Sequence, residues 1–248
     1  MLILLPPSEA KRAPVRGKSL DVGALSHPEL GDLREELLAA LVALCRENAP
    51  GAMAALGLGP TQFDLVVQNA GLRTAPTAVA GSVYTGVLYS ALQYPELTGT
   101  DKRRANRRIA IVSALFGLVS PTDRIPAYRL SGGSKLPGHA GLATYWRDAV
   151  SAQVDAHNGL VVDMLSSPYN GFVNLPPDAV TVKVWQPGPG GQRTAVSHFN
   201  KATKGHLARA LAQCEREPRR PKDVLEVARE AGFDVSLDGT RLDVAILP

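Results

Sequence analysis

The chain has 248 residues, 45% of them hydrophobic and 20% charged, and 27 Lys and Arg against 23 Asp and Glu give a net charge of +4. This composition is typical of a globular protein and excludes a disordered chain, a collagen or a coiled coil. No apolar stretch is long enough to span a bilayer, and residues 1–7 lack the basic start of a signal peptide. Two cysteines cannot form a disulfide framework. We therefore expect a single domain over 1–248, located in the reducing cytoplasm and not associated with a membrane.

Apolar patterns in the first half of the chain predict both strands and helices. Leu2–Leu5 is a short buried strand that ends at two prolines. Leucines at helical spacing predict an amphipathic helix over 28–48, and a second helical piece follows over 52–56. Another buried strand, over 109–113, comes directly after a run of arginines.

The second half of the chain continues the same mixture. In chain order we expect a helix over 142–155, strands over 160–164 and 179–185, a turn over 186–191, a strand over 194–199 paired with the preceding one, helices over 201–216 and 222–231, and a hairpin over 233–246 around an Asp-Gly turn. Buried strands together with hairpin strands predict an α/β fold: one compact domain with a mixed β-sheet flanked by helices.

A turn inside the predicted helical insert, about 28–65, has a pattern seen in DNA-binding proteins. Leu56–Pro60 alternates apolar residues with glycines between two helical segments. It resembles a helix-hairpin-helix turn, in which glycines let backbone amides approach a DNA phosphate. Such turns also join helices that bind nothing, and the basic residues expected after the hairpin are missing here.

The positive charge is concentrated in one segment. Residues 101–108 hold five basic residues against one acidic residue, a local +4, so the rest of the chain sums to zero. Clustered cations are what a nucleic-acid backbone requires, and a later predicted helix adds three more. The alternative interpretation is a solvated basic surface. We predict sequence-tolerant DNA binding through Lys102, Arg103, Arg104, Arg107, Arg108, Lys201, Lys204 and Arg209.

Other short motifs carry weak signals. Ser8 and Lys11 fit the Ser-x-x-Lys pattern of serine acyl enzymes, but the companion motifs of those enzymes are absent. The turn over 131–135 offers backbone N–H groups and a lysine to an anion, yet it lacks the order of a phosphate loop. The five histidines show no metal-ligand spacing, so we predict neither a metal site nor a cofactor.

Several blocks resemble, in the right order, the YaaA family of bacterial peroxide-stress proteins. The most specific block, 113–130, reads SALFGLVSPTDRIPAYRL and is similar to the family's run around a Tyr-Arg-Leu end. This sequence departs from the family at Ala114, Phe116 and Pro168, where Gly, Tyr and Glu are common. The remaining similar blocks are 5–11, 83–87, 133–136, 145–146, 166–169 and 199–209.

The resemblance implies an α/β domain with a basic cleft, DNA binding, and protection against peroxide and iron-dependent oxidative damage. The densest similarity lies around a Tyr-Arg pair rather than in the arginine run, and this motivates a second hypothesis beside DNA binding. In that hypothesis the protein is an enzyme acting on a nucleotide-like or phosphorylated small molecule, an anionic ligand of the same cleft. A buried polar network without a ligand is the remaining interpretation. The candidate catalytic residues are Ser8, Glu9, Lys11, Tyr128, Arg129 and Lys135.

Overall fold

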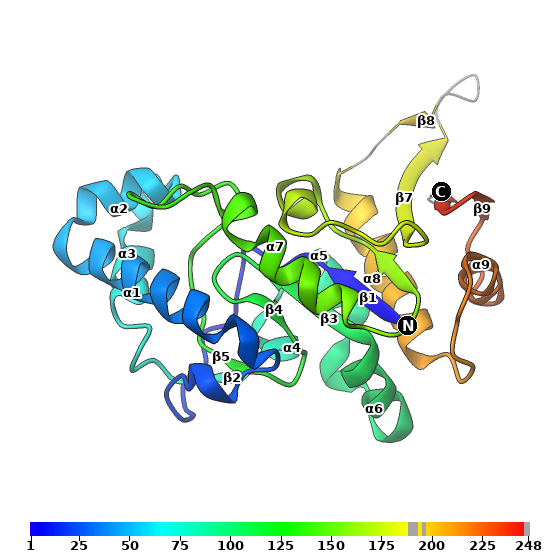
Figure 1. The fold of residues 1–248 in the computed structure, drawn as a ribbon, viewed down its shortest axis with the longest axis horizontal. Helices are drawn as coiled ribbons and strands as arrows, with labels where there is room; N and C mark the ends of the chain where they lie inside the picture. The colour runs from blue at the N-terminus through cyan, green and yellow to red at the C-terminus, as the bar shows by residue number, and fades with distance from the viewer. Residues whose placement is uncertain (188–192, 195–196, 246–248) are drawn as a thin grey trace.

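Parallel strands form the centre of the main sheet in the computed structural model, which describes residues 1–187, 193–194 and 197–245 (Figure 1). The strands β3, β1, β6, β7 and β10 run parallel, and the edge strands β4 and β9 are antiparallel to their neighbours. This is the predicted mixed sheet. The strands follow one another across the sheet in the order β4 (Gly117–Val119), β3 (Ile109–Ser113), β1 (Leu2–Leu5), β6 (Val161–Asp163), β7 (Val180–Pro187), β10 (Arg241–Ala245) and β9 (Val235–Asp238).

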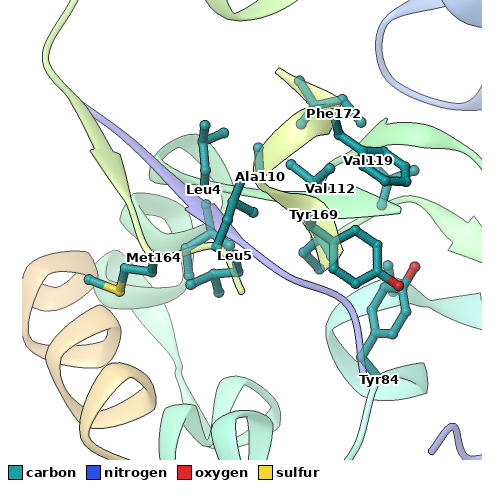
Figure 2. Close-up of a cluster of buried hydrophobic side chains, with 14 of the residues drawn as sticks. Leu4, Leu5, Tyr84, Ala110, Val112, Val119, Met164, Tyr169 and Phe172 are labelled. Atoms are coloured by element: carbon teal, nitrogen blue, oxygen red, sulfur yellow. The ribbon is translucent and has the colours of Figure 1, made fainter. Parts of the chain in front are cut away.

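The two central strands are apolar along their whole length because both of their faces are covered. Every residue of β1 and β3 is buried, and Ile3 lies opposite Ile109 on one side and Val162 on the other. Figure 2 shows side chains of these strands packed with Tyr169 and Phe172, which come from the segment after β6. The core is thus continuous from the sheet into the loop that follows β6.

Helices flank the sheet, and α1, α2 and α3 lie together at one end of the molecule while α9 and β9 lie at the other (Figure 1). The described part of the chain contains no helix long and apolar enough to cross a membrane. Two short strands, β2 (Ala78–Val79) and β5 (Arg124–Ile125), pair with each other. The helices are α1 (Gly31–Glu47), α2 (Ala49–Leu56), α3 (Phe63–Ala70), α4 (Ala80–Val83), α5 (Val87–Leu92), α6 (Gly99–Arg108), α7 (Leu142–Asp155), α8 (Ser197–Gln213) and α9 (Pro221–Glu230).

Most predicted elements are confirmed within a few residues, and one strand is wrong in extent. The strand expected over 194–199 is limited to β8 (Arg193–Thr194), which pairs with β7, because α8 already begins at Ser197. The apolar side chains of α8 are buried at helical spacing, at Leu207 and Leu211. Residues 188–192 of the predicted turn, residues 195–196 and Ile246 lie outside the described residues.

The connections leave β1 and β6 in opposite directions across the sheet. From β1 the chain crosses to β3 on one side, and from β6 it passes to β7 on the other. Where neighbouring parallel strands diverge in this way, the loops at their carboxyl ends separate and leave a crevice that is the usual ligand site of an open α/β sheet. The loops in question are residues 6–11 and 164–170.

Candidate functional site

A pocket of about 760 Å³ opens at this divergence, and we call it the switch-point pocket. Its walls come from the loops after β1 and β6, the start of α5, the middle of β7 and the start of α8. The volume lies within the range of small-molecule sites, and apolar groups such as Pro7, Leu88 and Met164 form much of the lining. Its charged lining residues are Glu9, Lys183, Lys201 and Lys204, so three cations face one carboxylate.

The lysine that is most firmly held in the pocket is Lys204. Its Nζ donates hydrogen bonds to the main-chain carbonyls of Met164 at 3.2 Å and Leu165 at 3.0 Å. Burial lowers the pKa of Lys204 to about 8, although the nearby Asp163 carboxylate opposes the shift. The carbonyls of one loop thus fix a cation whose proton exchanges close to neutral pH.

Close packing of α8 against α5 brings these lysines to the pocket. A Cβ atom at Gly205 would lie 2.2 Å from the carbonyl oxygen of Leu88, so only glycine permits this approach. The same position falls within the Lys-Gly-His run of the sequence block that resembles the family. The contact therefore places Lys201 and Lys204 opposite the loop after β1.

Ser8 lines the pocket, but its hydroxyl is used to hold the loop after β1. The Oγ accepts a hydrogen bond from the Thr85 N–H at 2.9 Å and donates one to the Ala10 carbonyl at 2.5 Å. Lys11 donates to the main-chain carbonyl of Ser8 at 2.8 Å and not to the hydroxyl. This geometry is not that of a lysine-activated serine nucleophile.

Lys11 lies beneath the same loop and against aromatic rings. Its Nζ is 4.1 Å from the ring centroid of Tyr128 and 5.5 Å from that of Tyr84. Burial lowers the pKa of Lys11 to about 7; Glu9 opposes this shift and Arg129 adds to it. Lys11 is therefore a second group that changes its charge near neutral pH.

Tyr128 belongs to a buried chain of hydroxyl groups. Its hydroxyl lies 3.0 Å from that of Tyr84 and 2.8 Å from the Oγ of Ser113 at the end of β3. Burial raises the pKa of Tyr84 to about 12 and that of Tyr128 well above its ordinary value, so both phenols keep their protons at neutral pH. Among the interpretations given in the sequence analysis (DNA binding, an enzyme site, or a buried polar network without a ligand), the buried polar network describes Tyr128 best.

Arg129 forms an ion pair with Glu9 across the edge of the pocket. Glu9 is one of the lining residues and Arg129 is not, so of this pair only the carboxylate belongs to the pocket wall. The backbone of Arg129 is held by Asn69, whose amide accepts from its N–H at 2.9 Å and donates to its carbonyl at 2.7 Å. The structure thus joins two predicted site residues from distant parts of the chain.

Lys135 lies apart from these groups. It lines a smaller cavity of about 250 Å³ together with Ser134 and with Gly57, which has a left-handed φ of 62°. The glycine turn and the 131–135 turn, both noted in the sequence, therefore face each other. The link to the switch-point pocket is indirect: the Gly132 N–H donates to the hydroxyl of Tyr169, a pocket residue, at 3.1 Å.

The arginine run forms helix α6, and its side chains divide between surface and interior. Arg103 and Arg107 are exposed and one helical turn apart. Arg108 is buried, and it donates to the Glu217 carboxylate and to main-chain carbonyls that include those of Leu211 and Cys214. Arg108 thus joins the ends of α6 and α8 and presents no exposed face to a phosphate.

The other basic residues of the predicted set also have partners within the fold. Arg104 pairs with Asp101, and Lys102 lies 3.3 Å from the ring centroid of Tyr94 and donates to its carbonyl. Arg209 donates to the carbonyls that end α5. The eight predicted phosphate-binding residues therefore do not gather in one place: Lys201 and Lys204 line the pocket, and α6 carries most of the rest.

Sequence reasoning missed several lining residues. Lys183 lies within the predicted strand 179–185, and Tyr169 and Asn170 follow β6. The available signal was the rule that loops at the carboxyl ends of diverging parallel strands bind ligands, which needs the strand order and not only the strands. Pro168 also lines the pocket, so the position where the family commonly has Glu here supplies an apolar wall.

The described residues contain no group of three or more His, Cys, Asp and Glu side chains that could hold a metal ion.

The family described as peroxide stress protein YaaA matches residues 1–238. The chain belongs to this family.

Curated relatives of this family come from several bacteria. A UPF0246 protein of Streptomyces coelicolor is 41% identical, with 96% of this chain and 93% of the relative covered. A UPF0246 protein of Corynebacterium efficiens is also 41% identical, over 100% and 99% of the two chains. A UPF0246 protein of Shewanella loihica is 30% identical over 85% of each. The similarity thus covers nearly the full length of the chain and includes both loops of the pocket.

Proposed function

We propose that this peroxide-stress protein acts in the cytoplasm on a nucleotide-like or phosphorylated small molecule bound in the switch-point pocket. The observation that carries the proposal is the place of the pocket, at the carboxyl ends of two diverging parallel strands. Three lysines on its walls supply the charge that a phosphate requires.

The lining supports both parts of such a ligand. Apolar groups, among them Pro6, Leu88 and Val184, offer a surface to a base or another flat apolar moiety. Lys201 and Lys204 face the phosphate, and Lys204 holds a proton that exchanges near neutral pH. The Glu9 carboxylate is the acceptor among the charged lining residues.

Calorimetric titration with AMP tests this proposal. We expect binding by the unchanged protein and at least a tenfold weaker affinity in the double variant Lys201→Met, Lys204→Met, because both cations of the phosphate end are lost. The matched control is Arg103→Gln, Arg107→Gln, which removes two exposed charges outside the pocket. The absence of AMP binding at millimolar concentration, or equal affinities in both double variants, would contradict the proposal.

A second candidate function is DNA binding that limits iron-dependent oxidative damage, as the family resemblance implies. The observation in its favour is the exposed pair Arg103 and Arg107 on one face of α6, in a chain of pI about 9.2. Exposed arginines one turn apart on a helix suit neighbouring phosphates of one strand.

The DNA hypothesis is tested by fluorescence polarisation with duplex and branched DNA across a salt series. Each phosphate contact contributes about 0.9 to the log–log salt slope, so Arg103→Gln, Arg107→Gln should lower the slope by about 2. The control is Arg12→Gln, Arg16→Gln, which removes two exposed charges outside α6 and should leave the slope unchanged. An unchanged slope in the arginine variant would exclude α6 as a DNA contact.

A further inference from the structure

The ion pair between Glu9 and Arg129 joins a residue of the pocket wall to one outside it. Glu9 belongs to the loop after β1 and lines the pocket, while Arg129 lies 120 residues further along the chain. The carboxylate thus occupies a position between the pocket and a guanidinium. A ligand that enters the pocket meets the glutamate before the arginine.

The two partners are held to very different extents. The Glu9 side chain is 55% exposed, whereas that of Arg129 is 21% exposed. Asn69, which is fully buried, fixes the backbone of Arg129 through two hydrogen bonds. A rotamer change is therefore enough to move the Glu9 carboxylate, whereas the backbone that carries the guanidinium is held by Asn69 and its side chain is the less exposed of the two.

The Glu9 carboxylate does not use all the donors of Arg129. It accepts a hydrogen bond from Nη1, and the Nε of Arg129 is buried without a hydrogen-bond partner among the described residues. Guanidinium groups bind phosphates and carboxylates best through two parallel N–H donors. A buried donor without a partner is costly, so a second acceptor oxygen at this point would be favourable.

A second cation lies close to the same loop. Lys11 is held under residues 8 and 9 and contacts their main-chain carbonyls at 2.8 and 3.5 Å. Below about pH 7, where Lys11 is protonated, Arg129 and Lys11 together outnumber the single carboxylate of Glu9. The local charge suits a group that carries more negative charge than a glutamate.

We propose that Glu9 occupies an anion subsite formed by Arg129, and that a second phosphate group of the ligand displaces it. The ligand class is then a nucleoside diphosphate, with one phosphate at Lys201 and Lys204 and the other at Arg129. This inference rests on the proposed small-molecule function. Glu9 in this arrangement favours ligands that have a second anionic group over those, such as AMP, that have only one.

The test compares AMP and ADP by calorimetric titration. In the unchanged protein ADP binds more tightly than AMP. Glu9→Gln should tighten ADP about tenfold and AMP by a clearly smaller factor, because only the second phosphate competes directly with the carboxylate. Arg129→Gln should remove the advantage of ADP over AMP, and Arg129→Lys should restore part of it.

A matched control uses an ordinary surface pair. Glu35 and Arg73 form an ion pair at 2.9 Å with both side chains exposed, so Glu35→Gln should leave both affinities unchanged. Equal effects of Glu9→Gln on AMP and ADP, or no preference for ADP, would overturn the subsite while leaving AMP binding intact. If neither nucleotide binds to any variant, the small-molecule function itself fails and the subsite fails with it.

Discussion

Helix α6 and the switch-point pocket are both basic, but their charge has different origins. In α6 the basic residues are consecutive in sequence, yet Arg108 is buried and Arg104 is paired, so the fold itself uses much of the charge. In the pocket the lysines come from β7 and α8, and the fold assembles them around a cavity. The basic residues of α6 thus serve partly to hold the fold together, whereas the pocket gathers lysines from separate elements around one cavity.

Arg108 gives the largest expected effect. Arg108→Met leaves several main-chain carbonyls and the Glu217 carboxylate without their donor, so we expect the free energy of unfolding to fall by about 3–5 kcal/mol. Its neighbour Arg107 is exposed, and Arg107→Met should change this free energy by less than about 0.5 kcal/mol. Urea unfolding of both variants measures the difference. Similar values for the two would show that α6 is a surface helix throughout.

The next effect concerns the wall of the pocket. Gly205→Ala places a methyl group against the Leu88 carbonyl and must push α8 away from α5, at a cost of about 1–3 kcal/mol. Gly133 has open space around it, so Gly133→Ala is the matched control, with an expected change below about 0.5 kcal/mol. Thermal unfolding compares the two. If Gly205→Ala unfolds at the same temperature as the unchanged protein, α8 can move away from α5 at little cost in stability.

Lys11 gives a pH-dependent effect. Folded Lys11 loses its proton above about pH 7, while the unfolded chain keeps it up to about 10.5, so the unfolded state binds more protons between these values. The stability that depends on Lys11 therefore rises with pH across this window. We therefore compare the free energy of unfolding of Lys11→Met with that of the unchanged protein. The difference in favour of the variant should be largest below pH 7 and should decrease by on the order of 1 kcal/mol by pH 9.

Urea unfolding at pH 6.5 and pH 9 measures this change. The loss of the hydrogen bond to the Ser8 carbonyl lowers the stability of the variant equally at both pH values, so only the difference between them reports the charge. If the free energies of unfolding of the two proteins differ by the same amount at both pH values, Lys11 does not carry a charge under the loop that it loses near neutral pH.

The smallest expected effect on stability comes from the exposed face of α6. Arg103→Gln, Arg107→Gln should leave the free energy of unfolding within about 0.5 kcal/mol of the unchanged protein, because neither side chain is buried. Thermal unfolding would detect a larger loss. Such a loss would place these arginines with Arg108 in the fold and weaken the comparison between the two regions.

The sequence predicted the fold well where burial alone sets the pattern. The strands over 2–5 and 109–113 and the helix over 142–155 were each recognisable from apolar spacing. The helix in the arginine run was not, since Ala105 is the one apolar residue between Gly99 and Arg108. The strand over 194–199 is limited to β8 because α8 begins at Ser197, and six residues are too few for their composition to distinguish a strand from the start of a helix.

The candidate site was predicted only in part. Ser8, Glu9, Lys201 and Lys204 line one pocket, but the sequence placed the first two with catalysis and the last two with DNA. Their union depends on strand order, which brings β1 beside β6, and on the contact of α8 with α5 at Gly205. Lys135 was grouped with Arg129 because the two are close in sequence, yet the chain turns away toward Gly57.

The attachment of Lys204 to the carbonyls of Met164 and Leu165 has a consequence for how such a pocket evolves. Carbonyl groups belong to the main chain and are present whatever side chain a position carries. Substitutions in the loop after β6 can therefore change the shape and polarity of the wall while the ammonium group keeps its place. The positive charge at this point of the pocket wall therefore does not depend on which side chains that loop carries.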